Sequence, residues 1–250
     1  MMEYYRPGGY RMLTPAVKNL LIINVIFFVM TYVILSVFHY DITKDLGLYF
    51  IKSDNFRPYQ FVTHMFMHGN FGHLFFNMFA LWMFGKNIEV IWGPKRFLIY
   101  YFVTGLGAAA FHTLVNYISY SSNLSMLTEE QIQYIYTNGP DLWLSGQTFT
   151  IEPMKKIHIL LNVPTVGASG AVFGLLLAFG MLFPNALIYV YFAIPLRAKY
   201  FVLLYGLLEL YAGVLNQQGD NIAHFAHLGG MIFGLLFILL WKKYKFQRWD

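Results

Sequence analysis

Three clusters of polar side chains interrupt the apolar stretches of this sequence. They are His64, His68, His73 and Asn77; then Gly167-Ala168-Ser169-Gly170; and finally His224 and His227. A serine hydroxyl is a weak nucleophile unless a neighbouring base takes its proton, and a neutral histidine is suited to that role. Ser169 with His227 as its base therefore predicts acyl transfer, provided that the fold brings the two side chains together.

The first cluster supplies hydrogen-bond donors for the same reaction. His73 and Asn77 are four residues apart, so they project from one face of a helix. With the backbone N–H of Ser169, they can donate to the oxyanion that develops when a carbonyl group is attacked. The alternative is that both side chains hold helices together, which is the commoner role of polar residues in membrane bundles.

The elements that must position these residues are transmembrane helices. The chain has 250 residues, of which 58% are hydrophobic and 12% charged, whereas soluble domains carry about 25% charged residues. Its apolar residues occur in long blocks, each close to the roughly 20 residues that span a bilayer. They predict an all-α bundle of six transmembrane helices at 17–38, 71–91, 97–118, 168–184, 199–215 and 224–241.

The distribution of positive residues predicts the orientation of this bundle. One side holds twelve Lys and Arg residues and the other five, so both termini are predicted to be cytoplasmic. The first apolar block is expected to be the first span rather than a cleavable signal. The predicted divisions are an N-terminal tail over 1–16, a membrane domain over 17–241 with long outer loops at 39–70 and 119–167, and a basic tail over 242–250 that binds anionic lipid.

In this topology the three clusters lie toward the outer ends of the second, fourth and sixth helices, so they can meet at one depth. Small residues recur at four-residue spacing beside the two reactive side chains: Gly170, Gly174 and Ala178 after the serine, and Gly230 and Gly234 after the histidine. Small residues let two helix backbones approach closely, as a serine and a histidine on different helices require. In the outer loop, Thr128-Glu129-Glu130-Gln131 has the form of a capping box before a short helix.

The three clusters resemble the motifs of the rhomboid family. The segment 73–77 is similar to its His-x-x-x-Asn motif, 167–170 to its Gly-x-Ser-Gly motif, and 226–234 to its Ala-His-x-x-Gly-x-x-x-Gly signature. The order and the spacing agree, and the similarity covers about residues 14–243. One departure lies in the first outer loop, where Tyr59-Gln60 stands in place of the family's Trp-Arg pair; it puts in doubt the usual anchoring of this loop by an arginine.

The resemblance implies an intramembrane serine endopeptidase that cleaves single-span membrane proteins near the outer face of the bilayer, through an acyl-enzyme. It implies a Ser–His dyad without a carboxylate, with Ser169 as nucleophile and His227 as base. His73 and Asn77 would assist at the oxyanion, and Gly167 would shape the loop before the serine. No metal or organic cofactor is implied. The compact form and short tails lead us to expect a bacterial inner membrane.

Other roles are open for several polar residues. His224 lies one turn before His227 and is a rival base, although the small residues that follow His227 favour the latter. His64 and His68 have the spacing of a zinc-binding pair, but no glutamate lies between them as a general base, so structural hydrogen bonding is expected. Glu209, inside the fifth span, is expected to be protonated and hydrogen-bonded.

Two other classes of function are also open. One is a catalytically inactive, rhomboid-like protein that binds membrane helices, and an intact Ser169 and His227 argue against it. The other is a small transporter, for which repeat symmetry or paired broken helices are expected and are not evident. No motif suggests nucleic-acid binding, and the absence of cysteine excludes disulfides and thiolate chemistry.

Overall fold

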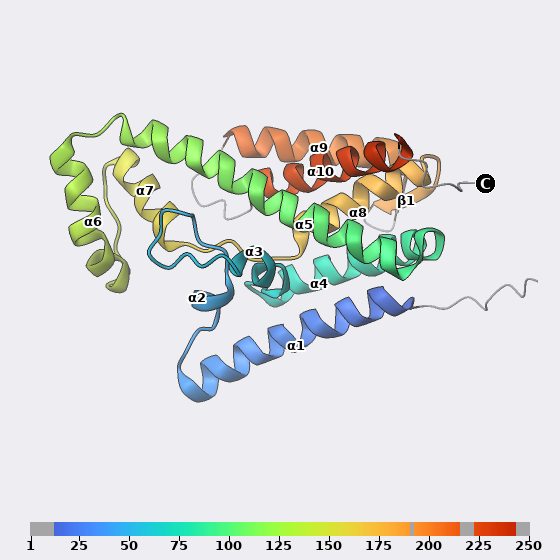
Figure 1. Cartoon of the computed structure of the whole chain (residues 1–250), viewed down its shortest axis with the longest axis horizontal. Coiled ribbons are helices and arrows are strands. Elements are labelled where there is room, and N and C mark those ends of the chain that lie inside the picture. Colours follow the sequence, from blue (N-terminus) through green and yellow to red (C-terminus); the bar gives the residue numbers. More distant parts are fainter. Residues whose placement is uncertain (1–12, 191–192, 216–222, 244–250) are drawn as a thin grey trace, which may run out of the picture.

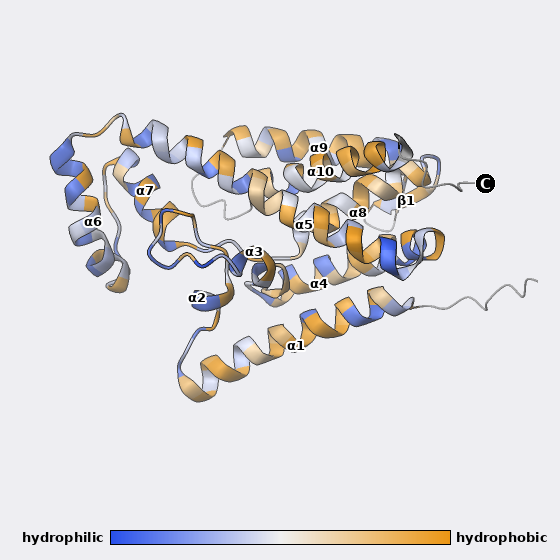
Figure 2. Cartoon of the chain, viewed as in Figure 1, coloured by the Kyte–Doolittle hydropathy of each residue, from blue (hydrophilic) through white to orange (hydrophobic). Residues whose placement is uncertain are grey.

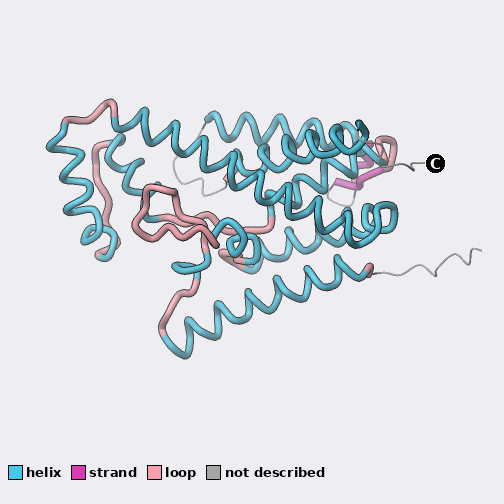
Figure 3. The backbone as a smooth tube through the Cα atoms, in the orientation of Figure 1, coloured by secondary structure: helices cyan, strands magenta, loops and turns pink. Residues whose placement is uncertain are grey.

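The protein is a bundle of helices with one β-hairpin (Figures 1 and 3). The structure, a computed structural model, describes residues 13–190, 193–215 and 223–243; the predicted tails lie largely outside them. The elements in chain order are α1 (Pro15–Phe38), α2 (Thr43–Leu46), α3 (Gln60–Thr63), the 3-10 helix η1 (His64–Phe66), α4 (Phe71–Ala80), the π-helix η2 (Leu81–Gly85), α5 (Lys86–Leu124), α6 (Glu129–Leu144), α7 (Glu152–Asn162), α8 (Ser169–Leu182), β1 (Leu187–Val190), β2 (Ile194–Arg197), α9 (Ala198–Leu215) and α10 (His224–Lys243).

Among the described residues, four helical runs are long and apolar enough to cross a membrane. They are Pro15–Phe38, Phe71–Leu124, Ala198–Leu215 and His224–Trp241. Apolar residues cover these runs and α8, whereas α6 is largely polar (Figure 2). The α8 helix has 14 residues and is about 21 Å long at 1.5 Å per residue, less than the ~30 Å hydrocarbon core.

The second of these runs contains a chain reversal. Gly93 has φ 75° and ψ 162°, a conformation that interrupts the helix and favours glycine, and Pro94 follows it. Figure 1 shows α4 approaching this point and α5 returning from it. The reversal separates the predicted segments 71–91 and 97–118, although helical hydrogen bonding on both sides makes the run 54 residues long.

The hairpin between α8 and α9 was not predicted from the sequence. Strands β1 and β2 pair antiparallel from Leu187↔Arg197 to Val190↔Ile194, at the end of the bundle to which α8 runs (Figure 1). Four-residue strands are too short to give a clear alternating pattern, and pairing of the two strands supplies partners for their backbone groups.

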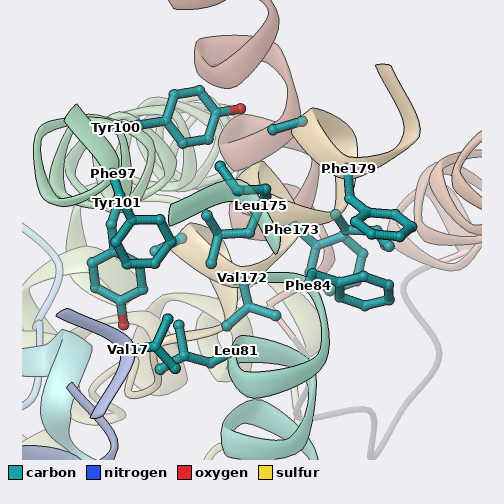
Figure 4. Close-up of a cluster of buried hydrophobic side chains, with 14 of the residues drawn as sticks. Val17, Leu81, Phe84, Phe97, Tyr100, Tyr101, Val172, Phe173, Leu175 and Phe179 are labelled. Carbon is teal, nitrogen blue, oxygen red and sulfur yellow. The ribbon is translucent and has the colours of Figure 1, made fainter. Parts of the chain in front are cut away.

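A buried apolar cluster joins α1, α5, α8 and the π-helix. Its largest side chains include Phe97, Tyr100, Tyr101, Phe173 and Phe179 (Figure 4). A second, smaller cluster joins the C-terminal end of α5 with α6 and α7. The predicted capping box at Thr128 and Gln131 is confirmed, since each side chain bonds the other residue's backbone N–H.

A buried carboxylate attaches α1 to the rest of the bundle. Glu89 is 3% exposed, and its oxygens accept from the backbone N–H groups of Ala16 and Val17, both at 2.9 Å, and from the hydroxyl of Thr14. The first N–H groups of a helix have no partner within the helix, and negative charge is favourable there. Glu89 therefore caps α1 and fixes where the helix begins against α5.

We expect Glu89→Ala to lower the thermal stability of the detergent-solubilised protein substantially. Each buried N–H left without a partner costs about 1–3 kcal/mol, and the substitution frees two. Glu89→Gln keeps one acceptor oxygen and should give a smaller decrease. Differential scanning fluorimetry measures both changes, with Asp141→Ala at an exposed position as the control; equal melting temperatures for all three variants would contradict the capping role.

Candidate active site

Ser169 is the first residue of α8, and the glycine two positions before it gives the preceding loop its shape. Gly167 has φ 130°, where a side chain is strained. A Cβ atom there would lie 2.8 Å from Cε1 and Nε2 of His73 and 3.6 Å from Ser169 Oγ. The imidazole of His73 and the serine hydroxyl therefore lie around the same small space, which the absence of a side chain at Gly167 keeps open.

The loop before the serine is fixed to the first outer loop. Leu48 and Thr165 form an antiparallel bridge, with N···O distances of 2.9 and 2.8 Å. The N–H of Gly167 donates to the carbonyl of His64 at 2.9 Å, and His112 Nε2 lies 3.1 Å from Thr165 Oγ1. These contacts hold the turn into α8 from both sides.

Helices α8 and α10 approach each other at glycines next to Ser169 and His227. A Cβ atom on Gly230 would overlap the carbonyl of Gly170, and one on Gly170 would lie 3.6 Å from the carbonyl oxygen of Ala226. Gly170 follows the serine, and Ala226 precedes the histidine. The backbones that carry Ser169 and His227 are therefore in close contact at these residues, as the small-residue spacing predicts.

Helix α5 packs against both α8 and α10 beside this contact. A Cβ atom on Gly174 would lie within 2.8 Å of three side-chain atoms of Thr104. The hydroxyl of Tyr100 donates to the carbonyl of Gly174 at 2.8 Å, and a Cβ on Gly234 would overlap that hydroxyl. Glycines on α8 and α10 thus accommodate two side chains of α5.

The imidazole of His227 is held on its face and at one nitrogen. It stacks on Phe173 with ring centroids 4.1 Å apart and planes 7° apart. Phe173 lies one turn after Ser169 and leans back toward it, as helical side chains do. The Nδ1 atom of His227 lies 2.8 Å from a carboxylate oxygen of Glu209 on α9. Phe173 was not identified from the sequence, although its four-residue spacing from the serine is the relevant signal.

The contact with Glu209 corrects the expectation of a histidine without a carboxylate. The same oxygen, Oε2, also lies 2.6 Å from Nδ1 of His224. Glu209 is hydrogen-bonded, as predicted, but its partners are the two histidines of the third cluster. Both histidines therefore contact Glu209 through Nδ1. The fifth span carries a single acidic residue, and nothing in the sequence shows which helix it faces.

No hydrogen bond joins Ser169 Oγ to His227, although the structure describes both residues. Hydrogen bonds between a nucleophile and its base are often long or poorly aligned before substrate binds. The stacking on Phe173 and the contact between Gly170 and Ala226 place the two residues on adjoining turns of packed helices.

The two predicted oxyanion donors lie on α4, His73 in its first turn and Asn77 one turn further on. The side chain of Asn70 caps this helix by accepting from the N–H of His73 at 2.8 Å. Asn77 is buried, and its Nδ2 donates to the carbonyl of His73 at 2.9 Å. An amide nitrogen carries two hydrogens, so this bond leaves one for another acceptor. The His73 ring lies beside Gly167 and hence beside the serine.

His64 and His68 are both buried, and the hydrogen bonding expected of them is found for His64 and not for His68 among the described residues. Nδ1 of His64 lies 2.8 Å from the carbonyl of Gln60, and both ring nitrogens of His68 are buried without a partner among the described residues. Burial lowers the pKa of each histidine to about 4, so both rings are neutral at physiological pH. Where three potential ligands do gather, they are Glu209, His224 and His227.

Gln60 holds the segment 45–60, where the resemblance led us to expect anchoring by an arginine. The residue is fully buried. Its Oε1 accepts from the backbone N–H groups of Tyr49 and Arg57 at 3.3 and 3.0 Å, and its Nε2 donates to the carbonyls of Asp45 and Asn55 at 3.1 and 3.0 Å. These four bonds hold the loop from 45 to 60 in one conformation. Arg57 adds two bonds within the same loop, donating to the carbonyls of Asp54 and Phe56 at 2.8 and 2.7 Å.

Fold and site together define a helical membrane protein with a serine at the start of a buried helix and a histidine on the helix packed against it. The chain belongs to the rhomboid family, because residues 55–244 match the Rhomboid domain. It is an integral membrane protein, as its apolar helices and its family indicate.

Three relatives illustrate the similarity. The chain is 30% identical to RHOMBOID-like protein 12, mitochondrial, of Arabidopsis thaliana, over 73% of this chain and 47% of the relative. It is 28% identical to Rhomboid protein 1, mitochondrial, of Saccharomyces cerevisiae, over 69% and 38%, and 28% identical to Rhomboid protease AarA of Providencia stuartii, over 71% and 54%. The chain thus spans about half the length of these relatives. Two of them are mitochondrial, so a bacterial inner membrane is not supported.

We expect Gly230→Ala to destabilise the bundle, because its methyl group would overlap the backbone of Gly170 and no side-chain movement relieves that overlap. Overpacking typically costs about 1–3 kcal/mol. Thermal unfolding in detergent measures the effect. Gly69→Ala is the control, since a Cβ there meets no atom within 4 Å; a melting temperature for Gly230→Ala equal to that of the control would contradict the close approach.

We expect Gln60→Leu to loosen residues 45–60, because two backbone N–H groups and two carbonyls lose their partners. Hydrogen–deuterium exchange followed by mass spectrometry should show faster exchange in this segment. The neighbouring Tyr59 is exposed, so Tyr59→Leu serves as the control and should exchange like the wild type. Unchanged exchange in Gln60→Leu would show that other contacts hold the loop.

Proposed function

We propose that this protein is an intramembrane serine endopeptidase in which Ser169 is the nucleophile and His227 the general base. The observation that carries the proposal is the stacking of His227 on Phe173, one turn from Ser169, where the two helix backbones are closest. A relative named Rhomboid protease AarA supports proteolysis as the reaction. The expected substrates are single-span membrane proteins.

The reaction follows from the groups present. His227 takes the hydroxyl proton through Nε2 while Ser169 Oγ attacks the carbonyl carbon of the peptide bond. The resulting imidazolium then gives that proton to the leaving amine, and an acyl-enzyme remains. Water attacks this ester with His227 again as base, which releases the new carboxyl end and regenerates the serine.

The oxyanion that forms at each attack needs donors. The N–H of Ser169 is at the positive end of α8, where a helix favours negative charge. His73 lies across Gly167 from the serine, and Asn77 has one amide hydrogen in excess of its bond to the helix. We infer that these three groups stabilise the oxyanion. A small cavity of about 10 Å³ beside Ser169, whose largely apolar lining includes His64, His112 and Thr165, has room for about one water molecule.

We infer six membrane spans from these helices. The run Phe71–Leu124 contributes two, because the chain reverses at Gly93. The α8 helix contributes the fourth despite its 14 residues, since buried neighbours surround it and lipid does not have to cover its ends. With the positive residues inside, the N-termini of α4, α8 and α10 are directed to the outer half of the bilayer, and cleavage occurs near that face.

We expect purified wild-type protein in liposomes to cleave a labelled single-span substrate and to react with a fluorophosphonate probe, whereas Ser169→Ala does neither. A metal chelator should leave the wild-type rate unchanged. Ser145→Ala, at an exposed position, is the control and should remain active. Cleavage by Ser169→Ala would remove this serine from the mechanism, and an unreactive wild type would favour a helix-binding protein.

A further inference from the structure

We propose that Glu209 is the third member of this site, a positioning residue that holds His227 in the tautomer and orientation required for it to accept the serine proton. The proposal rests on the proposed function, since it concerns how its base is held. It makes the site a Ser–His–Glu arrangement with residues contributed by α8, α10 and α9.

Glu209 is exceptional on its own helix. Most side chains of α9 are exposed and apolar, and only Ala198, Val202 and Glu209 are buried. A carboxyl group inside a membrane helix is costly and needs a partner. Glu209 is therefore buried on the side of α9 that faces α10, and its partners there are the two histidines of that helix.

Glu209 contacts Nδ1 of His227, and the protonation of Nδ1 determines whether Nε2 can accept a proton. A neutral imidazole carries one N–H, so a hydrogen on Nδ1 leaves a lone pair on Nε2. The oxygen 2.8 Å from Nδ1 of His227 accepts that hydrogen. Phe173 fixes the plane of the same ring. Together the two contacts leave Nε2 as the basic nitrogen and restrict the directions in which it points.

His224 completes the network. A carboxylate oxygen has more than one lone pair, and Oε2 receives Nδ1 of His224 at 2.6 Å as well as Nδ1 of His227. An ionised Glu209 therefore satisfies both rings in the same tautomer. It also opposes the positive charge that His227 carries while it holds the serine proton, and that proton is not transferred to Glu209.

Hydrogen bonding accounts for this cluster better than a metal ion. Two zinc ligands at about 2.0–2.1 Å from a tetrahedral ion lie about 3.3 Å apart. The histidine nitrogens of the cluster lie 2.6 and 2.8 Å from a single oxygen of Glu209. These separations suit a proton shared between each pair and are too short for two ligands of one tetrahedral zinc.

The competing explanation is that Glu209 only attaches α9 to α10. A variant on the same helix separates the two possibilities. Val202 is buried where α9 packs on Gly180 of α8, about two helical turns from Glu209. Val202→Ala should therefore weaken the packing of α9 and leave the hydrogen bond between Glu209 and His227 unchanged.

The experiment compares Glu209→Gln, Glu209→Asp and Val202→Ala for kcat and KM on the labelled substrate and for thermal unfolding. An amide can donate to Nδ1 and so put the hydrogen on Nε2, which disables the base; losses of up to about 10⁴-fold in kcat accompany a wrong tautomer in serine proteases. We expect Glu209→Gln to lower kcat by at least about 100-fold with little change in KM. Glu209→Asp should recover part of that loss. Val202→Ala should lower the thermal stability and leave kcat unchanged. If Glu209→Gln keeps kcat within threefold and only lowers stability, Glu209 is a structural attachment.

A second measurement is independent of catalysis. Nitrogen-15 NMR of histidine-labelled protein in micelles distinguishes the two tautomers, and a His227→Gln variant assigns the signal. We expect Nδ1–H for His227 in the wild type and its loss in Glu209→Gln; Nε2–H in the wild type would overturn the proposal. If Ser169→Ala and wild type are equally active or equally inactive, the proposed function fails, while the tautomer still decides whether Glu209 holds His227.

Discussion

The close contact of α8 and α10 is the constraint on which the rest of the structure depends. Gly230 lies directly against the carbonyl of Gly170, so there is no room for a side chain at either position. That contact sets the separation of Ser169 and His227, which flank it. Because the contact lies between backbones, a change of side-chain rotamer does not alter the distance between the two helices. Thr104 and Tyr100 of α5 pack into the same row of glycines and keep the two helices together.

A membrane bundle imposes a second constraint, which is that buried polar groups need partners within the protein. Glu89 satisfies the first N–H groups of α1, Gln60 satisfies four backbone groups of the outer loop, and Glu209 satisfies two imidazoles. Each of these side chains joins segments that are distant in the sequence. The polar residues therefore determine where the helices begin and how the loops lie, while the apolar cluster fills the space between them.

The sequence was sufficient for features that depend on local pattern. Apolar blocks located the helices, the capping box at Thr128 marked the start of α6, and glycine spacing identified the helix faces that meet at Gly170 and Gly230. It was insufficient where a residue acts through tertiary contact. Nothing local to Glu209 indicates that it faces α10, and the family pattern suggested a histidine without a carboxylate. Gln60 was noted only as a departure, because its four partners come together through the fold of the loop.

The residues of the site lie on helices that differ in how tightly they are packed. Ser169 and the backbone of His227 belong to the packed core of α5, α8 and α10, whereas α9 buries few of its side chains. Glu209 lies on α9, and its carboxylate contacts the imidazole of His227 from that helix. A displacement of α9 away from α10 would break the bond at Nδ1 and leave the contact between α8 and α10 in place. On the proposed function, the orientation of the base would then depend on the position of α9, and the position of the nucleophile on the packing of α8 against α10.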